Sequence, residues 1–128
     1  MRTLLILALA LTTGCTPTEP GPIEPGTVDM TVMQNGWPSF SDDLDYALES
    51  QRQRAILSQS EFDETKERQR DWWAALVLFD DFAALKIYYD AGYWDEFIEA
   101  VYWSADDRGH AQDRRDAKAY DDIVRGML

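Results

Sequence analysis

The sequence predicts an all-α protein: a small antiparallel bundle of three to four helices that follows a disordered, proline-rich tether. Three observations predict this fold. Apolar residues in the second half of the chain recur at helical spacing, and no run of β-branched residues typical of a strand appears. Four of the five prolines gather within residues 17–25. A chain of 128 residues has room for one domain.

The first residues have the three parts of a secretory signal. Arg2 gives a positive start, Leu4–Leu11 is an uninterrupted apolar run, and small residues follow up to Gly14. A helix over the apolar run would be only about 12 Å long, whereas the hydrocarbon core of a bilayer is about 30 Å thick. We therefore expect residues 1–14 to be a signal peptide rather than a transmembrane helix.

The stretch Leu11–Cys15, LTTGC, resembles the lipobox of bacterial lipoproteins. The resemblance implies that the chain is cleaved before Cys15 and that this cysteine carries a diacylglycerol, with a further N-acyl chain in many Gram-negative species. It also implies a cell-envelope location facing the periplasm, where Thr16 in place of Asp favours the outer over the inner membrane. Two or three acyl chains would anchor the protein stably. The alternatives are an ordinary signal peptide with a chance cysteine and a cytosolic protein with an apolar N-terminus.

Residues 15–36 are predicted to form the lipidated tether. Its prolines favour extended backbone and oppose helix formation; they are Pro17, Pro20, Pro22 and Pro25. At about 3.1 Å per residue, the segment after the cysteine would reach roughly 60 Å. A short strand over Thr27–Met33 is an alternative. The remaining residues, 37–128, are predicted to form the folded domain.

Two capping patterns predict the first helices of this domain. Ser39 followed by Asp42 has the form of an N-terminal cap and opens a helix that ends at about Leu57. Ser60 followed by Asp63 repeats the pattern and opens a second, long helix.

The second predicted helix is apolar on almost every face from Trp72 to Tyr89, which is typical of a buried helix. Only Asp80, Asp81 and Lys86 interrupt this segment. Because an unpaired carboxylate is costly in apolar surroundings, we expect the two aspartates to meet a basic side chain or to mark a surface that a partner covers. Gly92 is placed to end the helix.

Two further helices complete the predicted bundle. The third runs from Tyr93 to about Ser104, with apolar residues on one face, and a turn follows over Asp106–Gly109. The last helix covers about Ala111 to Met127. Because the intervening loops are short, neighbouring helices should run antiparallel.

The net charge of −12 narrows the classes of partner. An acidic surface repels nucleic acid and anionic lipid headgroups, and it attracts basic partners or divalent cations; the alternative is that the charge serves solubility alone. A protein partner, basic in character, is therefore expected, together with the membrane reached through the lipid. No phosphate-binding glycine loop is present, so no cofactor is expected apart from the covalent lipid on Cys15.

Few residue types suited to catalysis or metal binding are present. The single cysteine is assigned to the lipid, and His110 has no serine motif to activate. One cysteine and one histidine do not make a zinc site of the usual kind, and the paired aspartates lack calcium-loop spacing. No catalytic residue and no metal ligand is assigned.

Aromatic residues gather between Trp72 and Trp103, and most of them should form the core. If several are exposed together, they would form an interface, because Trp and Tyr dominate binding hot spots. The candidate partner surface comprises Trp72, Trp73, Asp80, Asp81, Tyr93, Trp94 and Trp103.

These features favour a lipid-anchored, non-enzymatic binding module, such as an accessory or assembly subunit of a membrane or envelope complex. An alternative is an exclusion or immunity lipoprotein of a phage or plasmid. A minor alternative is a hydrolase of cell-wall glycans, which needs a cleft holding two carboxylates.

Overall fold

The structure, a computed structural model, describes residues 28–128 and confirms the all-α fold. The predicted signal peptide, Cys15 and most of the predicted tether lie outside the described residues. Five α-helices and one π-helical turn make up the domain; they are α1 (Thr31–Gln53), α2 (Gln59–Trp73), η1 (Ala74–Leu78), α3 (Phe82–Asp90), α4 (Tyr93–Arg108) and α5 (Ala111–Met127).

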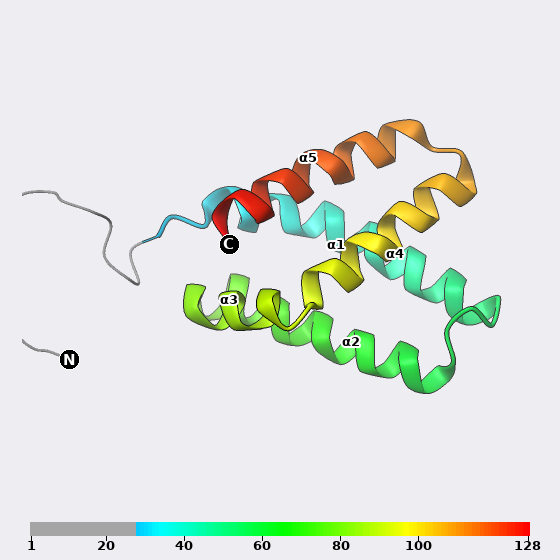
Figure 1. Cartoon of the computed structure of the whole chain (residues 1–128), viewed down its shortest axis with the longest axis horizontal. Coiled ribbons are helices and arrows are strands. Elements are labelled where there is room, and N and C mark those ends of the chain that lie inside the picture. The colour runs from blue at the N-terminus through cyan, green and yellow to red at the C-terminus, as the bar shows by residue number, and fades with distance from the viewer. Residues whose placement is uncertain (1–27) are drawn as a thin grey trace, which may run out of the picture.

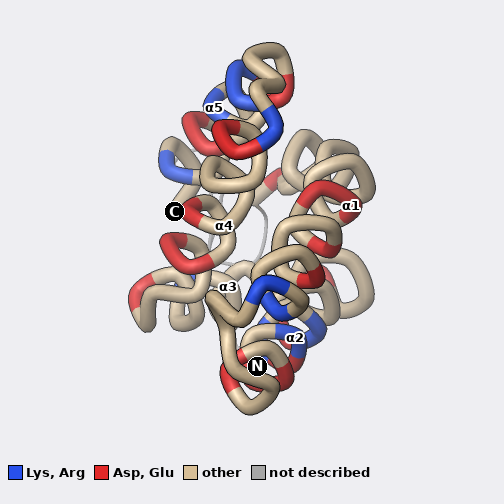
Figure 2. Tube along the Cα trace, turned by 90° about the vertical axis from the view of Figure 1, so that its right-hand side faces the viewer, with Lys and Arg blue, Asp and Glu red and all other residues tan. Residues whose placement is uncertain are grey.

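Helix α4 is the centre of the bundle, since it contacts α1, α2, α3 and α5. In Figure 1, α5 lies along one side of α4, and α2 and α3 lie along the other. The view of Figure 2 separates α4 and α5 from α1 and α2, with acidic and basic residues interspersed along the helices.

The core is rich in stacked aromatic rings. The Trp94 side chain is fully buried, and its ring lies 5.6 Å from that of Trp72 and 4.7 Å from that of Phe40, centroid to centroid. Its indole nitrogen donates a hydrogen bond to Asp121 of α5, which also accepts one from Arg125. These contacts join α1, α2, α4 and α5 around one side chain.

The first helix begins earlier than predicted, so the predicted domain boundary at residue 37 is wrong. Helix α1 starts at Thr31, whose backbone N–H donates to the Asp29 carboxylate, and it includes Pro38 in its third turn. The reason is burial: Met33 and Trp37 continue the apolar face of the helix and are almost inaccessible to solvent. That gain offsets the hydrogen bond that a proline cannot donate. The alternative prediction of a strand over Thr27–Met33 is wrong for Thr31–Met33, because these residues belong to α1.

The second helix begins at a different cap from the one predicted. Ser58 and Glu61 form a complete capping box, in which each side chain accepts a hydrogen bond from the backbone N–H of the other residue. The predicted pair of Ser60 and Asp63 lies inside α2. Glutamate suits this motif because its longer side chain reaches back to the N-cap N–H.

The long apolar helix predicted through Trp72–Tyr89 is broken in two, which is why the bundle has five helices. The backbone widens into the π-helical turn η1, Asp80 takes a left-handed conformation at φ 52°, and Asp81 caps α3 by accepting from the N–H of Ala84. Neither aspartate meets a basic side chain among residues 28–128, and Lys86 pairs with Asp90 instead. The alternative, a surface that a partner covers, stays a prediction. Both aspartates are exposed, so the helix break avoids a buried carboxylate.

The predicted ends of the last helices are mostly confirmed. Gly92 follows the end of α3 with φ 93°, a left-handed conformation suited to glycine. Helix α5 has the predicted bounds, Ala111–Met127. The turn predicted over Asp106–Gly109 is wrong for its first three residues, which continue α4; only Gly109 leaves the helix, with φ 69°.

Gly36 permits the close packing of α5 on α1, and its replacement by alanine should destabilise the domain. A Cβ atom at this position would lie 2.6 Å from Cε1 of Tyr120, whose buried hydroxyl donates to the Met33 carbonyl. Because the ring is held in place, we expect Gly36→Ala to lower the free energy of unfolding by about 1–3 kcal/mol in urea titrations. Gly126→Ala in α5 is the control: a Cβ meets nothing there, and stability should be unchanged or slightly higher. Equal effects of the two substitutions would contradict this packing.

Candidate binding groove

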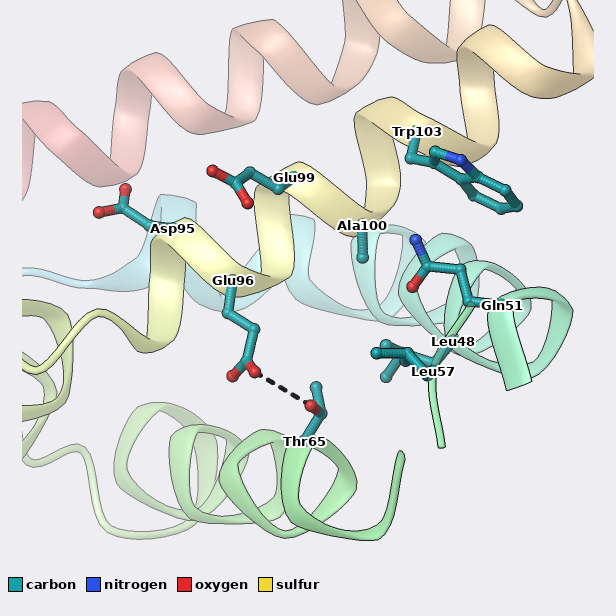
Figure 3. Close-up of a pocket in the computed structure, with 9 residues that line it drawn as sticks. All are labelled: Leu48, Gln51, Leu57, Thr65, Asp95, Glu96, Glu99, Ala100 and Trp103. Atoms are coloured by element: carbon teal, nitrogen blue, oxygen red, sulfur yellow. Dashed lines mark hydrogen bonds between the residues drawn. The ribbon is translucent and has the colours of Figure 1, made fainter. Parts of the chain in front are cut away.

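An open groove of about 560 Å³ lies between the start of α2, the C-terminal half of α1 and one face of α4. We call it the acidic groove. Its lining residues are Leu48, Gln51, Leu57, Thr65, Asp95, Glu96, Glu99, Ala100 and Trp103 (Figure 3). Three of them are carboxylates, all from α4, and three are aliphatic.

The spacing of residues along α4 produces this surface. Glu96, Ala100 and Trp103 follow one another at i, i+4 and i+7, and therefore project from one face of the helix toward α1 and α2. The neighbouring face carries Phe97 and Val101 into the core. Helix α4 thus supplies part of the core and one complete wall of the groove.

Glu96 is held in place by two side chains of α2. Its carboxylate accepts two hydrogen bonds from Arg68, at 2.7 Å from Nε and 2.9 Å from Nη2, and one from the Thr65 hydroxyl at 3.1 Å. The bonded carboxylate raises the pKa of the Arg68 guanidinium. Figure 3 shows Glu96 pointing from α4 down to Thr65. This arrangement positions the wall of the groove but leaves Glu96 already neutralised.

Glu99 is the carboxylate left available at the rim. It is exposed and has no hydrogen-bond or ion-pair partner among residues 28–128. Asp95, at the same edge, pairs with Arg125 of α5 at 2.7 Å. The Glu99 carboxylate is therefore free to form an ion pair with a cationic group of a partner.

Trp103 closes one end of the groove and already contacts a cation. The guanidinium carbon of Arg54 lies 5.2 Å from the centre of the Trp103 ring, and Arg54 also pairs with Asp107 at 2.7 Å. A cation over an indole face is stabilised by the ring quadrupole. The floor is apolar, because Leu48 and Ala100 are buried there. A carboxylate rim, an apolar floor and an aromatic end suit a basic segment that also carries apolar side chains.

The residues of the predicted partner surface do not form one surface. Trp72 and Trp94 are buried core residues with stacked rings, which corrects their assignment to a surface. Both side chains are buried because each projects from a helix face, on α2 and on α4, that packs against the core. Trp73, next in sequence, is 43% exposed.

The other predicted residues are dispersed. Asp80 and Asp81 are exposed at the junction of η1 and α3. Tyr93 is half-buried and stacks on Tyr88 with centroids 4.8 Å apart. Trp103 alone lines the acidic groove. Glu96 and Glu99 were not predicted as site residues, although their helical spacing from Trp103 places them on the same face.

Three further findings bear on the class of protein. Among residues 28–128, no group of three or more His, Cys, Asp or Glu side chains is arranged to hold a metal ion. Within the same part of the chain, every helix is too short or too polar to cross a membrane. Comparisons with known protein families, with curated proteins and with solved structures found no match to the chain.

Proposed function

We propose that this protein is a bacterial envelope lipoprotein whose helical domain is a non-enzymatic binding module. The chain is exported, cleaved before Cys15 and lipidated on that residue, with the domain facing the periplasm. The acidic groove receives a basic, partly apolar segment of a partner protein, and the protein acts as an accessory or assembly subunit of a membrane or envelope complex.

The open acidic groove carries this proposal. Two of its three carboxylates are committed to arginines of the same chain, Glu96 to Arg68 and Asp95 to Arg125. They shape the rim, while Glu99 is exposed and the partly exposed Leu57 and Trp103 offer apolar contact. Charge at the rim steers a basic partner to the site, and burial of apolar side chains on the floor supplies affinity.

Lipid anchoring is tested by Cys15→Ser in the full-length chain. Wild-type protein should be found in the membrane fraction, with an intact mass that matches a chain beginning at Cys15 and carrying acyl groups. The variant should be uncleaved or soluble, because its serine has no thiol to alkylate. Far-UV circular dichroism of both proteins checks that the domain is folded. A variant that is cleaved, acylated and membrane-bound like the wild type would overturn the anchoring.

A further inference from the structure

We propose that Val77, Leu78 and Phe79 form an apolar tip that inserts into the surface of the bilayer holding the lipid anchor. These three consecutive side chains are 44%, 58% and 69% exposed. Ile87, on the adjacent helix α3, is also exposed. This inference rests on the proposed lipid anchoring, since the anchor brings the bilayer close to the domain.

Backbone geometry makes the tip protrude. The π-helical turn η1 ends at Leu78, and the left-handed Asp80 then reverses the chain into α3. Side chains at the outer end of such a break project outward from the domain rather than lining a groove. Exposed apolar clusters of this kind are typical of interaction with a protein or a membrane.

The residues on either side of the tip are hydrogen-bonded to the first turn of α1, near the point where the described chain begins. The Gln34 side chain, in the first turn of α1, donates to the Leu76 carbonyl at 2.8 Å and to the Asp80 carboxylate at 2.9 Å. Figure 1 shows α3 at the same end of the molecule as the start of α1. Twelve residues lie between Cys15 and Val28, which gives a reach of at most about 45 Å from one to the other. Once Cys15 is lipidated, the start of α1 and the tip beside it therefore stay within that distance of the membrane.

A covalent anchor makes weak insertion effective. Three side chains alone would bind a bilayer marginally, but tethering turns insertion into an intramolecular step at high effective concentration. Asp80 and Asp81 flank the tip, so a zwitterionic surface suits it better than an anionic one. Insertion would also orient the domain: the connection from α1 to α2, beside the acidic groove, lies at the opposite end from α3 and would face away from the membrane (Figure 1).

The test uses full-length lipidated protein in phosphatidylcholine vesicles. Leu78→Cys is labelled with a polarity-sensitive fluorophore, and Ile56→Cys, a similarly apolar and exposed position at the opposite end, is the matched control. We expect a blue-shifted emission and quenching by lipid-borne quenchers at residue 78 only. Adding Phe79→Glu should abolish both signals without releasing the protein from the vesicles.

Two results would overturn the proposal, and they differ. If the protein remains on the vesicles while both labels report water, the tip does not insert, and the surface is left to a protein partner. If the wild-type chain itself takes up the thiol label and leaves the vesicles, Cys15 is unlipidated, and the anchoring fails together with the tip.

Discussion

Trp94→Ala should lower the free energy of unfolding by about 3–5 kcal/mol, the largest loss expected from a single substitution in this domain. The indole is 0% exposed and stacks on Trp72 and Phe40 from two different helices. Alanine would leave a cavity at the junction of four helices. Because small domains are stable by only about 5–15 kcal/mol, a large share of the folding free energy depends on this residue.

The loss has two components that can be separated. Trp94 also donates a buried hydrogen bond of 2.7 Å to Asp121, which retains its contact with Arg125 when the indole is removed. Trp94→Phe keeps most of the packing and removes only this donor, so we expect an intermediate loss of about 1–2 kcal/mol. Urea unfolding followed by far-UV circular dichroism measures both values.

Trp73→Ala is the matched control for the same residue type. Trp73 lies one position after Trp72 but is 43% exposed, so its removal should cost clearly less than that of Trp94. If the two alanine variants were destabilised equally, the assignment of Trp94 to the core and of Trp73 to the surface would be wrong.

Glu99→Lys should weaken binding of a basic amphipathic peptide by at least about tenfold, equivalent to about 1.4 kcal/mol. Glu99 is the rim carboxylate without an internal partner, so reversing its charge places a cation where the groove should accept one. Because the side chain is exposed, the stability of the domain should change little. Fluorescence anisotropy with a labelled Lys–Leu peptide at low salt measures the affinity.

Glu67→Lys controls for net charge. Glu67 is an exposed acid of α2 that does not line the groove, and its reversal changes the total charge by the same amount. We expect a much smaller effect on affinity, and a salt dependence that remains, because Glu99 is still present. Equal weakening by both substitutions would mean that the peptide responds to overall charge and not to the groove.

Local signals were enough to predict the later helices. Gly92 and Gly109 both adopt left-handed conformations, and glycine is the residue that does so without strain. The glycines and the amphipathic spacing between them therefore placed α4 and α5 closely, although α4 continues for four residues beyond its predicted end at Ser104.

Competing local signals misplaced the earlier boundaries. The capping pattern of Ser39 and Asp42 predicted a helix start at this point, but both residues lie inside α1, because burial of Met33 and Trp37 extends the helix toward the N-terminus. At Asp81, in contrast, a real helix start was not predicted. A residue able to cap a helix N-terminus was interpreted as an interruption within one, because the apolar run continued on both sides.

The groove could not be predicted from the sequence because it depends on how distant helices pack. Arg68 and Thr65 can both donate hydrogen bonds to Glu96 only because α2 packs against α4. The burial of Trp72 rather than Trp73 has the same origin. Both belong to a segment that is apolar on every face, so tertiary packing alone determines which side faces inward.

The most direct measurement is photo-crosslinking in cells from a photoreactive amino acid at position 99 of the full-length, lipidated chain, with position 67 as the control site. Our account predicts a defined crosslink to one envelope protein from position 99 but not from position 67, and its loss in a chain that also carries Cys15→Ser. The same crosslinks from both positions, or a defined partner captured from position 67 alone, would contradict the acidic groove as the binding site of this domain.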